Sequence, residues 1–271
     1  MSCSINIKPD GTGICLTKDD ILILIKTYNQ NHPSTPISTS GSKETLWNRI
    51  LQRMNKKCKS TDQVCVIQQV STNPSELIRD NFKPKGPKRQ YDWLSTSDIN
   101  NVMYHYEKLY PTFTFMGAIP RDFFNILKQI GNAKSVKKMS KKSKKIGLVF
   151  NTDKHNQSGS HWLAVFIDFE NDPITIEHFD SVGSPPMRDI NKFLTTIKNR
   201  INDDNLLGQN KTATILINKK QHQRGNNDCG VYSLHYIIER LKGRTFDDIT
   251  QTVIRDSEMN KRRLIYFRQD D

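Results

Sequence analysis

The chain has 271 residues, of which 35% are hydrophobic and 25% are charged, and its formal net charge at pH 7 is +13. This length accommodates one large domain or a compact domain with a smaller one, and the charge favours polyanionic neighbours such as nucleic acid, an acidic substrate or an anionic membrane surface. A membrane-spanning segment is excluded, because the apolar run of residues 21–25 is far too short to cross a bilayer.

The first 83 residues are predicted to form a helical arm. Apolar residues recur at helical spacing in residues 21–28 and 44–54, and shorter helices are expected at 64–70 and 75–81. Two prolines, a glycine and three lysines follow in residues 83–88, and this composition can continue neither a helix nor a central strand. The sequence therefore predicts two parts, an accessory arm at 1–83 and a core domain at 84–271.

The core domain is expected to begin with a helix capped by Ser97 and Asp98 that runs through Tyr106, then a short strand at 113–115 and an amphipathic helix from Pro120 that carries Phe123. A basic segment follows at residues 134–145. It holds seven lysines: Lys134, Lys137, Lys138, Lys141, Lys142, Lys144 and Lys145. We interpret it as a solvated loop, with a patch for nucleic acid or an acidic partner as the alternative.

Beyond the lysines the pattern changes to strands, at residues 146–150, 161–169, 174–179 and 212–217. Between the last two strands, residues 187–201 carry the apolar stripe of a helix. A second stripe covers 231–241 and ends at Gly243. This order predicts an α+β domain.

The five cysteines (Cys3, Cys15, Cys58, Cys65 and Cys229) are odd in number and widely scattered. This pattern does not suggest a disulfide framework, and no apolar signal segment opens the chain. We therefore expect a reduced, intracellular protein with free thiols. A zinc site is not favoured, because Cys58 and Cys65 lack the usual ligand spacing and no matched histidine pair follows them.

Cys229 stands where a polar loop meets the start of an apolar helix. The positive end of the helix dipole and the free N–H groups favour the thiolate, which is the reactive form. Gly230 beside it allows a substrate backbone to come close, whereas the carboxylate of Asp228 disfavours the thiolate. Taken alone, Cys229 is interpreted equally well as a small buried core residue.

His161 and Asp180 each lie at the end of a predicted strand. Alone, His161 is typical of an ordinary surface or core histidine, and Asp180 of a turn-initiating residue that bonds its own backbone. Together with Cys229 they supply what acyl transfer on a thiol needs: a nucleophile, a base that later protonates the leaving amine, and a group that holds the base in the correct tautomer.

The developing oxyanion also needs donors, each worth about two to three powers of ten in rate. Gln223, six residues before Cys229, is the candidate, together with the backbone N–H of Cys229, and Asn226 and Gln221 are alternatives. The order of histidine, acid and cysteine differs from that of papain-like enzymes, which place the cysteine first.

These motifs resemble the SUMO-protease and adenovirus-protease superfamily of cysteine peptidases, and most closely its polyprotein-processing branch of the African swine fever virus type. The resemblance rests on His161-Trp162, on Asp180 between Phe179 and Ser181, and on Gln223 followed by Cys229-Gly230, and it covers residues 84–271 best. It implies a central, mostly antiparallel sheet flanked by helices. It also implies a catalytic triad of His161, Asp180 and Cys229, with Gln223 in the oxyanion hole. Trp162 is then expected to line a narrow tunnel for small residues, and Asn151 is expected to be a further site residue.

The resemblance also implies a function. It suggests an endopeptidase that cleaves after Gly-Gly-like sites in viral structural polyproteins during particle maturation, in the virion and in the virus factory of the host cytoplasm. No metal or organic cofactor is required for that chemistry. The partners would be a polyprotein or another Gly-Gly-containing protein, and nucleic acid bound without sequence preference through the basic segment of residues 134–145.

Two alternatives remain open at this point. One keeps the chemistry and changes the substrate, so that the enzyme releases ubiquitin-like modifiers, which also end in Gly-Gly. The other is a basic nucleic-acid-binding protein without catalysis, motivated by the charge of +13, whose affinity would fall steeply with salt.

Overall fold

The computed structural model describes residues 3–59, 62–89, 91–123, 133–203 and 211–268. The chain divides into an N-terminal unit, Met1–Lys85 with Tyr266–Asp271, and a unit that we call the sheet unit, Gly86–Ile265. The expected boundary at 83/84 lies two residues from this division, whereas the last six residues group with the N-terminal unit and not with the core domain.

The N-terminal unit is built from four helices: α1 (Lys18–Asn31), α2 (Lys43–Met54), α3 (Gln63–Val70) and α4 (Pro74–Asn81). Thr17 caps α1 in a reciprocal capping box with Asp20, and Ser42 caps α2. The apolar faces of these helices meet in one core cluster, in which Leu24, Leu46 and Ile67 are fully buried.

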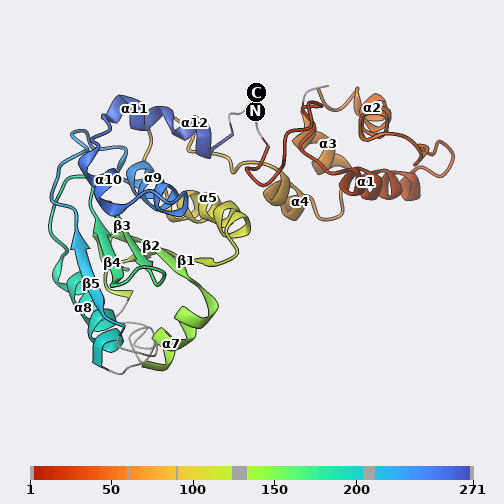
Figure 1. Ribbon diagram of the computed structural model, residues 1–271. Coiled ribbons are helices and arrows are strands. Elements are labelled where there is room, and N and C mark those ends of the chain that lie inside the picture. The colour runs from red at the N-terminus through yellow and green to blue at the C-terminus, as the bar shows by residue number, and fades with distance from the viewer. Residues whose placement is uncertain (1–2, 60–61, 90, 124–132, 204–210, 269–271) are drawn as a thin grey trace. The chain divides into compact units, whose positions relative to one another are not determined.

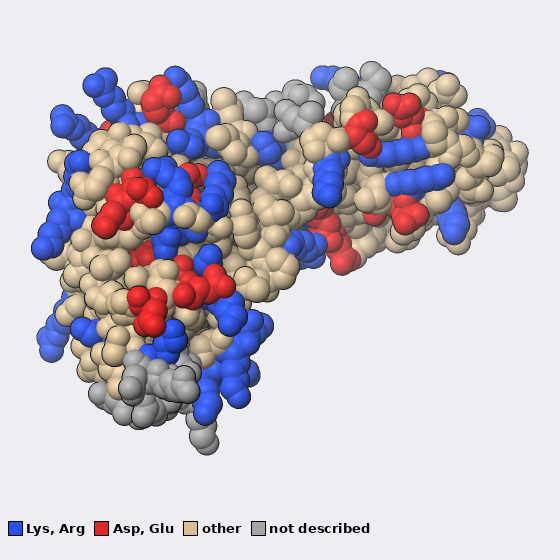
Figure 2. Space-filling model, viewed as in Figure 1, with Lys and Arg blue, Asp and Glu red and all other residues tan. Residues whose placement is uncertain are grey.

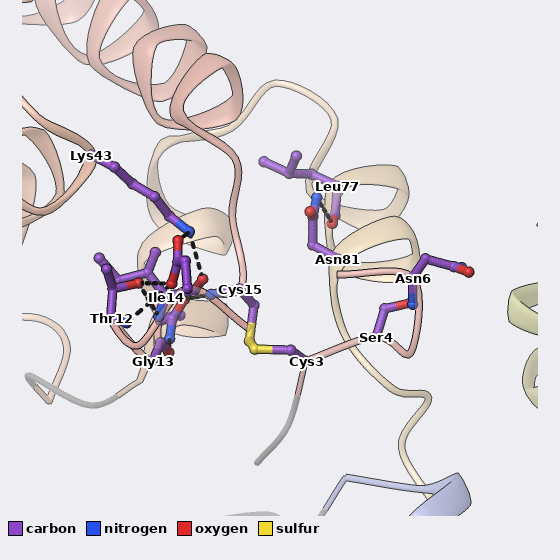
Figure 3. Close-up of a disulfide and its surroundings, with 12 residues drawn as sticks. Cys3, Ser4, Asn6, Thr12, Gly13, Ile14, Cys15, Lys43, Leu77 and Asn81 are labelled. Atoms are coloured by element: carbon purple, nitrogen blue, oxygen red, sulfur yellow. Dashed lines mark hydrogen bonds and ion pairs between the residues drawn. A yellow bond between two sulfur atoms is a disulfide. The ribbon is translucent and has the colours of Figure 1, made fainter. Parts of the chain in front are cut away.

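Two disulfides stabilise the N-terminal unit, so the expectation that the cysteines form no disulfide framework was wrong. Cys3 bonds to Cys15, with Cα atoms 5.0 Å apart, and Cys58 bonds to Cys65, with Cα atoms 5.7 Å apart. Next to the first bond, Lys43 donates to the carbonyl oxygen of Ile14 at 2.9 Å (Figure 3). The spacing of the cysteines does not predict these pairs, because the folding of the chain, and not a cysteine motif, brings the sulfur atoms together.

The sheet unit is an α+β fold around one five-stranded sheet in the order β1-β2-β3-β4-β5 (Figure 1). The strands are β1 (Phe113–Pro120), β2 (Lys145–Asn151), β3 (Trp162–Asp168), β4 (Ile174–Phe179) and β5 (Ala213–Ile217). The helices are α5 (Thr96–Leu109), α7 (Ala133–Lys142), α8 (Arg188–Asp203), α9 (Cys229–Leu241), α10 (Phe246–Gln251), α11 (Asp256–Lys261) and α12 (Arg263–Tyr266).

The sheet is mixed and not mostly antiparallel. β2 pairs with β3, and β3 with β4, in antiparallel fashion, whereas β1 with β2 and β4 with β5 are parallel. The parallel pairs arise because α7 lies between β1 and β2, and α8 between β4 and β5, and a crossover of this kind returns the chain in its original direction. All residues of the central strand β3 are buried, as expected for a strand covered on both faces.

Helices cover the two faces of this sheet (Figure 1). The stripe Ile190, Phe193, Leu194 and Ile197 of α8 packs into the core cluster formed with β2, β3 and β4. On the opposite face lie α5 and α9, and almost every residue of α9 is buried. Such a helix, apolar on nearly all sides, is typical of a protein core.

A buried ion pair ties α9 to the sheet. Arg240 donates from Nε to Glu177 Oε2 at 2.7 Å and from Nη2 to Asp168 Oδ2 at 3.3 Å, and Tyr236 donates its hydroxyl to the same Glu177. Removing one member of such a buried pair costs about 3–5 kcal/mol. The pair therefore fixes the position of α9 on β3 and β4, and with it the position of the residue that begins the helix.

Two local expectations need correction, and one falls outside the described residues. Residues 133–142 form helix α7 and not a loop, because Met139 packs against the core cluster beneath it and lysine is a good helix former. The cap of α5 is Ser95, in a capping box with Asp98, two residues before the expected cap. The amphipathic helix expected from Pro120 falls largely on residues 124–132, which lie outside the described residues.

Candidate active site

His161 and Asp180 meet at one edge of the sheet. β3 begins directly after His161 and β4 ends directly before Asp180, and in their antiparallel register Ala164 lies opposite Phe179. The two side chains extend beyond this pairing, and His161 Nε2 lies 2.7 Å from Asp180 Oδ1. The structure therefore brings together two residues that the sequence separates by two strands, β3 and β4, and the connection between them.

Asp180 is buried and held by further hydrogen bonds. Its Oδ1 also accepts the backbone N–H of Val182 at 3.0 Å, and its carbonyl oxygen accepts from Asn218 Nδ2 at 2.8 Å. The carboxylate of Asp180 thus hydrogen-bonds the backbone of its own turn and the imidazole of His161. Asp180 is therefore both a turn-initiating residue and a partner of the imidazole. A carboxylate fixed in this way can fix the orientation of the ring.

Cys229 is the first residue of α9, is 1% exposed, and is the free cysteine of the described residues. The neighbouring Asp228 does not act on it as an isolated charge. Its Oδ1 accepts from Arg263 Nη2 at 2.9 Å and from Asn260 Nδ2 at 3.1 Å. Because Arg263 compensates this carboxylate, the unfavourable effect on a thiolate that the sequence suggested is reduced.

The imidazole interacts with the thiol as well as with the carboxylate. Burial lowers the pKa of His161, but hydrogen bonds to Asp180 and to Cys229, together with the negative charge of both partners, raise that pKa to about 10. Since Nε2 is engaged by Asp180, Nδ1 is the nitrogen left to exchange a proton with the sulfur. The raised pKa of His161 favours the protonated imidazolium at neutral pH.

Gln223 lies in the loop before Cys229 and is 2% exposed. Its Nε2 donates to the carbonyl oxygen of Gly225 at 2.7 Å, and its Oε1 accepts from the hydroxyl of Ser181 at 2.7 Å. The amide nitrogen has two N–H groups, so one of them remains for a further acceptor. Of the two alternatives to Gln223, Gln221 is engaged by the carbonyl oxygen of Gln223 at 3.0 Å.

A cavity of about 630 Å³ is lined by residues next to this cluster in the chain, among them Trp162, which follows His161. Trp162 donates from Nε1 to the carbonyl oxygen of Leu94 at 2.8 Å. Sequence reasoning missed Trp93, which also lines the cavity and donates from Nε1 to Asn227 Oδ1 at 3.2 Å, two residues before the thiol. The only clue was Trp93-Leu94 directly before a helix cap, because the contact joins residues 134 positions apart.

Asn151 lines the same cavity, but its side chain is used to order the loop before His161. Its Oδ1 accepts the backbone N–H groups of Asp153 at 2.9 Å and Ser160 at 3.4 Å. Asp153 in turn accepts from the backbone N–H of Gly159 at 3.0 Å. Asn151 therefore supports the wall of the cavity.

Neither a metal centre nor a membrane segment is found in the part of the chain that the structure describes. Within those residues, no group of three or more histidine, cysteine, aspartate or glutamate side chains is arranged to hold a metal ion. None of the helices there has the length and apolar character needed to cross a bilayer.

A thiol at a helix N-terminus, paired with an imidazole that a carboxylate orients, is the arrangement of a cysteine protease, and comparison with known proteins supports this class. Residues 76–271 match the model of the Ulp1 protease family, C-terminal catalytic domain. The chain belongs to this family of cysteine proteases.

Relatives of this chain include proteins of two viruses. A protein of Acanthamoeba polyphaga mimivirus named as a thiol protease is 30% identical over 94% of this chain and 89% of its own length. The SUMO-1 cysteine protease of African swine fever virus is 27% identical over 74% of this chain and 77% of its own length. A crystal structure of the African swine fever virus protease pS273R aligns over 100% of this chain and 96% of that chain, with a TM-score of 0.73 and 24% identity, so the two share a fold.

Proposed function

We propose that the chain is an endopeptidase in which Cys229 is the nucleophile, His161 the general base and acid, and Asp180 the residue that orients the base. The observation that carries this assignment is the hydrogen bond of the half-buried imidazole of His161 to Asp180 at 2.7 Å. Interactions of the same imidazole with Asp180 and with Cys229 raise its pKa.

The reaction follows from this geometry. The thiolate of Cys229 attacks the scissile carbonyl carbon, and the negative charge that develops on oxygen is held by Gln223 and the backbone N–H of Cys229. The imidazolium of His161 then gives its proton to the leaving amine, and a thioester remains on the sulfur. Water, deprotonated by the neutral imidazole, hydrolyses that thioester and restores the thiol.

We propose that the substrate carries two small residues, such as Gly-Gly, before the cleaved bond. Trp93 and Trp162 both line this cavity, and two indole side chains in its wall would leave little room for large substrate side chains. Space is also short at Gly230, where an added Cβ would lie 3.0 Å from Leu94 Cβ. Leu94 lines the same cavity.

Cleavage of a peptide with an internal Gly-Gly pair tests both parts of the assignment. At neutral pH the full-length protein should cleave it, Gly→Ala changes in the peptide should reduce kcat/KM, and Cys229→Ala and His161→Ala should abolish turnover. Wild-type cleavage by Cys229→Ala would refute the nucleophile. Equal cleavage of the alanine-containing peptides would refute the small-residue passage and leave the nucleophile untouched.

The biological substrate that we favour is a structural polyprotein cut during maturation of a viral particle, in the virion and in the virus factory. The names and sources of the two viral relatives support this proposal. Release of a ubiquitin-like modifier is the competing function. A modifier–peptide fusion and a polyprotein fragment with the same Gly-Gly site separate the two, since a preference for the folded modifier would favour deconjugation. The N-terminal unit is then an accessory arm that contacts substrate or partner.

Helix α7 supports a second partner, nucleic acid bound through the basic segment of residues 134–145. Lys137, Lys138, Lys141, Lys142 and Lys144 are exposed, and within the described residues none of these five has an ion pair with a carboxylate. Figure 2 shows lysine and arginine side chains gathered in this region of the sheet unit. Met139 faces the core, so the helix presents its lysines outward without sequence-specific reading groups. Binding to phosphates without base preference is the expected mode.

Salt dependence tests this second partner. If the five lysines contact phosphates, the logarithm of the association constant for duplex DNA should fall against the logarithm of salt with a slope of roughly −4 to −5. Replacing Lys137, Lys138 and Lys141 with glutamine should reduce that slope by roughly 3. The same change at the exposed Lys56, Lys57 and Lys59 is the control, and an equal loss in the control would place binding elsewhere.

A further inference from the structure

Ser181 contacts the loop that carries Gln223 through both its backbone and its side chain. The carbonyl oxygen of Ser181 accepts the backbone N–H groups of His222 and Gln223, each at 2.8 Å. Its hydroxyl lies 2.7 Å from Gln223 Oε1. The residue is 1% exposed, so water does not compete for these bonds.

The carbonyl oxygen of Gly225 determines the orientation of the Gln223 amide, that is, which side its Nε2 and Oε1 face. A carbonyl oxygen only accepts, so the atom 2.7 Å from it must be the amide nitrogen Nε2. Oε1 then faces Ser181, and the serine hydroxyl is the donor. Gly225 is itself fixed, because its backbone N–H donates to Asp256 Oδ2 at 2.7 Å.

The side chain of Gln223 is therefore held at both ends, and the plane of its amide is fixed. One N–H of Nε2 is used by Gly225, and the other projects from a fixed plane. The hydrogen bond from Ser181 to Oε1 also polarises the amide, which makes the remaining N–H a stronger donor. Asp180, one residue before Ser181, holds the imidazole of His161.

We propose that Ser181 is a positioning residue of the protease, which aims the amide N–H of Gln223 at the oxyanion through the hydrogen bond to Oε1. The proposal rests on the proposed function, in which Gln223 stabilises the oxyanion. The turn after β4 then positions two parts of the catalytic apparatus, with Asp180 setting the base and Ser181 setting the oxyanion donor.

Loss of the hydroxyl should act on the transition state and not on substrate binding. In Ser181→Ala the Oε1 atom has no donor, and the amide can rotate away from its productive plane. Because one oxyanion donor contributes about 10²–10³-fold to kcat, we expect kcat to fall by roughly 10–100-fold, with KM changed by less than about twofold. Alkylation of Cys229 by iodoacetamide forms no oxyanion, so its rate should stay at the wild-type value.

A double-mutant cycle in the full-length protein tests the proposal. Ser181→Ala, Gln223→Ala and the double variant are compared by kcat, KM and the alkylation rate of Cys229, with Ser184→Ala, an exposed serine on the same turn, as the matched control. We expect Ser181→Ala to have no effect on kcat in the Gln223→Ala background. Ser181→Cys, with its weaker S–H donor, should lie between alanine and serine.

The possible outcomes distinguish the positioning role of Ser181 from the oxyanion role of Gln223. Full additivity in the cycle, or a parallel loss of alkylation rate in Ser181→Ala, would overturn the positioning role and leave the oxyanion assignment standing. Wild-type kcat in Gln223→Ala would overturn the oxyanion assignment, and the role of Ser181 with it. Cleavage by Cys229→Ala would remove the nucleophile on which both depend.

Discussion

A single carboxylate oxygen, Asp180 Oδ1, holds both the imidazole of His161 and the backbone N–H of Val182. Asp180 can act on His161 in two ways, by orienting the ring and by its negative charge. Substitutions at Asp180 can distinguish these two contributions. An uncharged acceptor could still orient the ring, whereas only the carboxylate can add its charge to the stabilisation of the imidazolium.

Asp180→Asn should therefore shift the pH profile more than it lowers the rate. The charge of Asp180 raises the pKa of His161, which is about 10, so its removal should lower that pKa and move the alkaline limb of kcat/KM to lower pH. We expect kcat to fall roughly tenfold in Asp180→Asn and roughly 10²-fold in Asp180→Ala, which loses the orienting acceptor as well. An alkaline limb that stays in place in both variants would contradict the role of this charge.

His178, two residues before Asp180, is fully buried, and neither ring nitrogen hydrogen-bonds another of the residues that the structure describes. Burial lowers its pKa to about 4, against a partial opposing effect of Asp180. The unfolded chain therefore binds a proton near pH 6.5 that the folded chain binds only near pH 4. Stability should fall as the pH drops through this window.

His178→Leu removes this acid sensitivity. Relative to the parent, its free energy of unfolding should rise by roughly 2–3 kcal/mol between pH 8 and pH 4.5, because the parent loses about 1.4 kcal/mol for each pH unit between about 6.5 and 4.5. Urea unfolding at several pH values measures this difference. A gap between variant and parent that does not change with pH would show that His178 does not titrate as its burial implies.

At the scale of elements, the contact of β2 with α9 depends on the absence of a side chain. An added Cβ at Gly147 would lie 2.9 Å from Phe113 Cζ and 3.3 Å from Ile237 Cγ2, and both neighbours belong to packed elements. Gly147→Ala should destabilise the protein by about 1–3 kcal/mol through overpacking, measured by thermal or urea unfolding. Phe113→Leu combined with Gly147→Ala should recover part of that loss, and purely additive losses would mean that the strain lies elsewhere.

The same scale shows what the sequence could predict. Alternating and stripe-like apolar patterns predicted β4 at its observed bounds and placed α1, α2, α8 and α9 within a few residues, because local periodicity sets which face is buried. Residues 134–145 were interpreted as a loop and not as helix α7, because a single packed methionine among lysines produces no apolar stripe at helical spacing. The parallel pairings of β1 and β5 depend on crossovers that periodicity does not encode.

The positions of the site residues divide in the same way. His161, Asp180 and Cys229 stand at the ends of predicted elements, and the structure places His161 Nε2 2.7 Å from Asp180 Oδ1. The triad that the motifs suggested stays a proposal. The role of Trp93 in lining the cavity and the hydrogen bonds between Ser181 and Gln223 were not predicted from the sequence. Their contacts join residues 134 and 42 positions apart, and only the folded chain brings those residues together.

For the molecule as a whole, the two disulfides predict an unequal response to reduction. Opening loops of 12 and 7 residues should destabilise the N-terminal unit by about 2–3 kcal/mol for each bond. Hydrogen exchange should therefore become faster in residues 3–85 on reduction and stay unchanged in β2, β3 and β4, which serve as the internal control. Unfolding without reductant should leave one cysteine open to alkylation, Cys229, and unfolding with reductant should expose five. More than one alkylated cysteine without reductant would contradict the two pairs.

Sulfur is thus present in opposite oxidation states within one chain. Cys3, Cys15, Cys58 and Cys65 are oxidised pairs, whereas the proposed nucleophile Cys229 works only while it is reduced. An oxidant strong enough to close the pairs can also inactivate a thiolate, and a reductant strong enough to protect the thiolate can open the pairs. The enzyme should therefore combine full activity with two closed disulfides only within a limited redox range. The near-complete burial of Cys229 should widen that range, because it limits the access of oxidants to the sulfur.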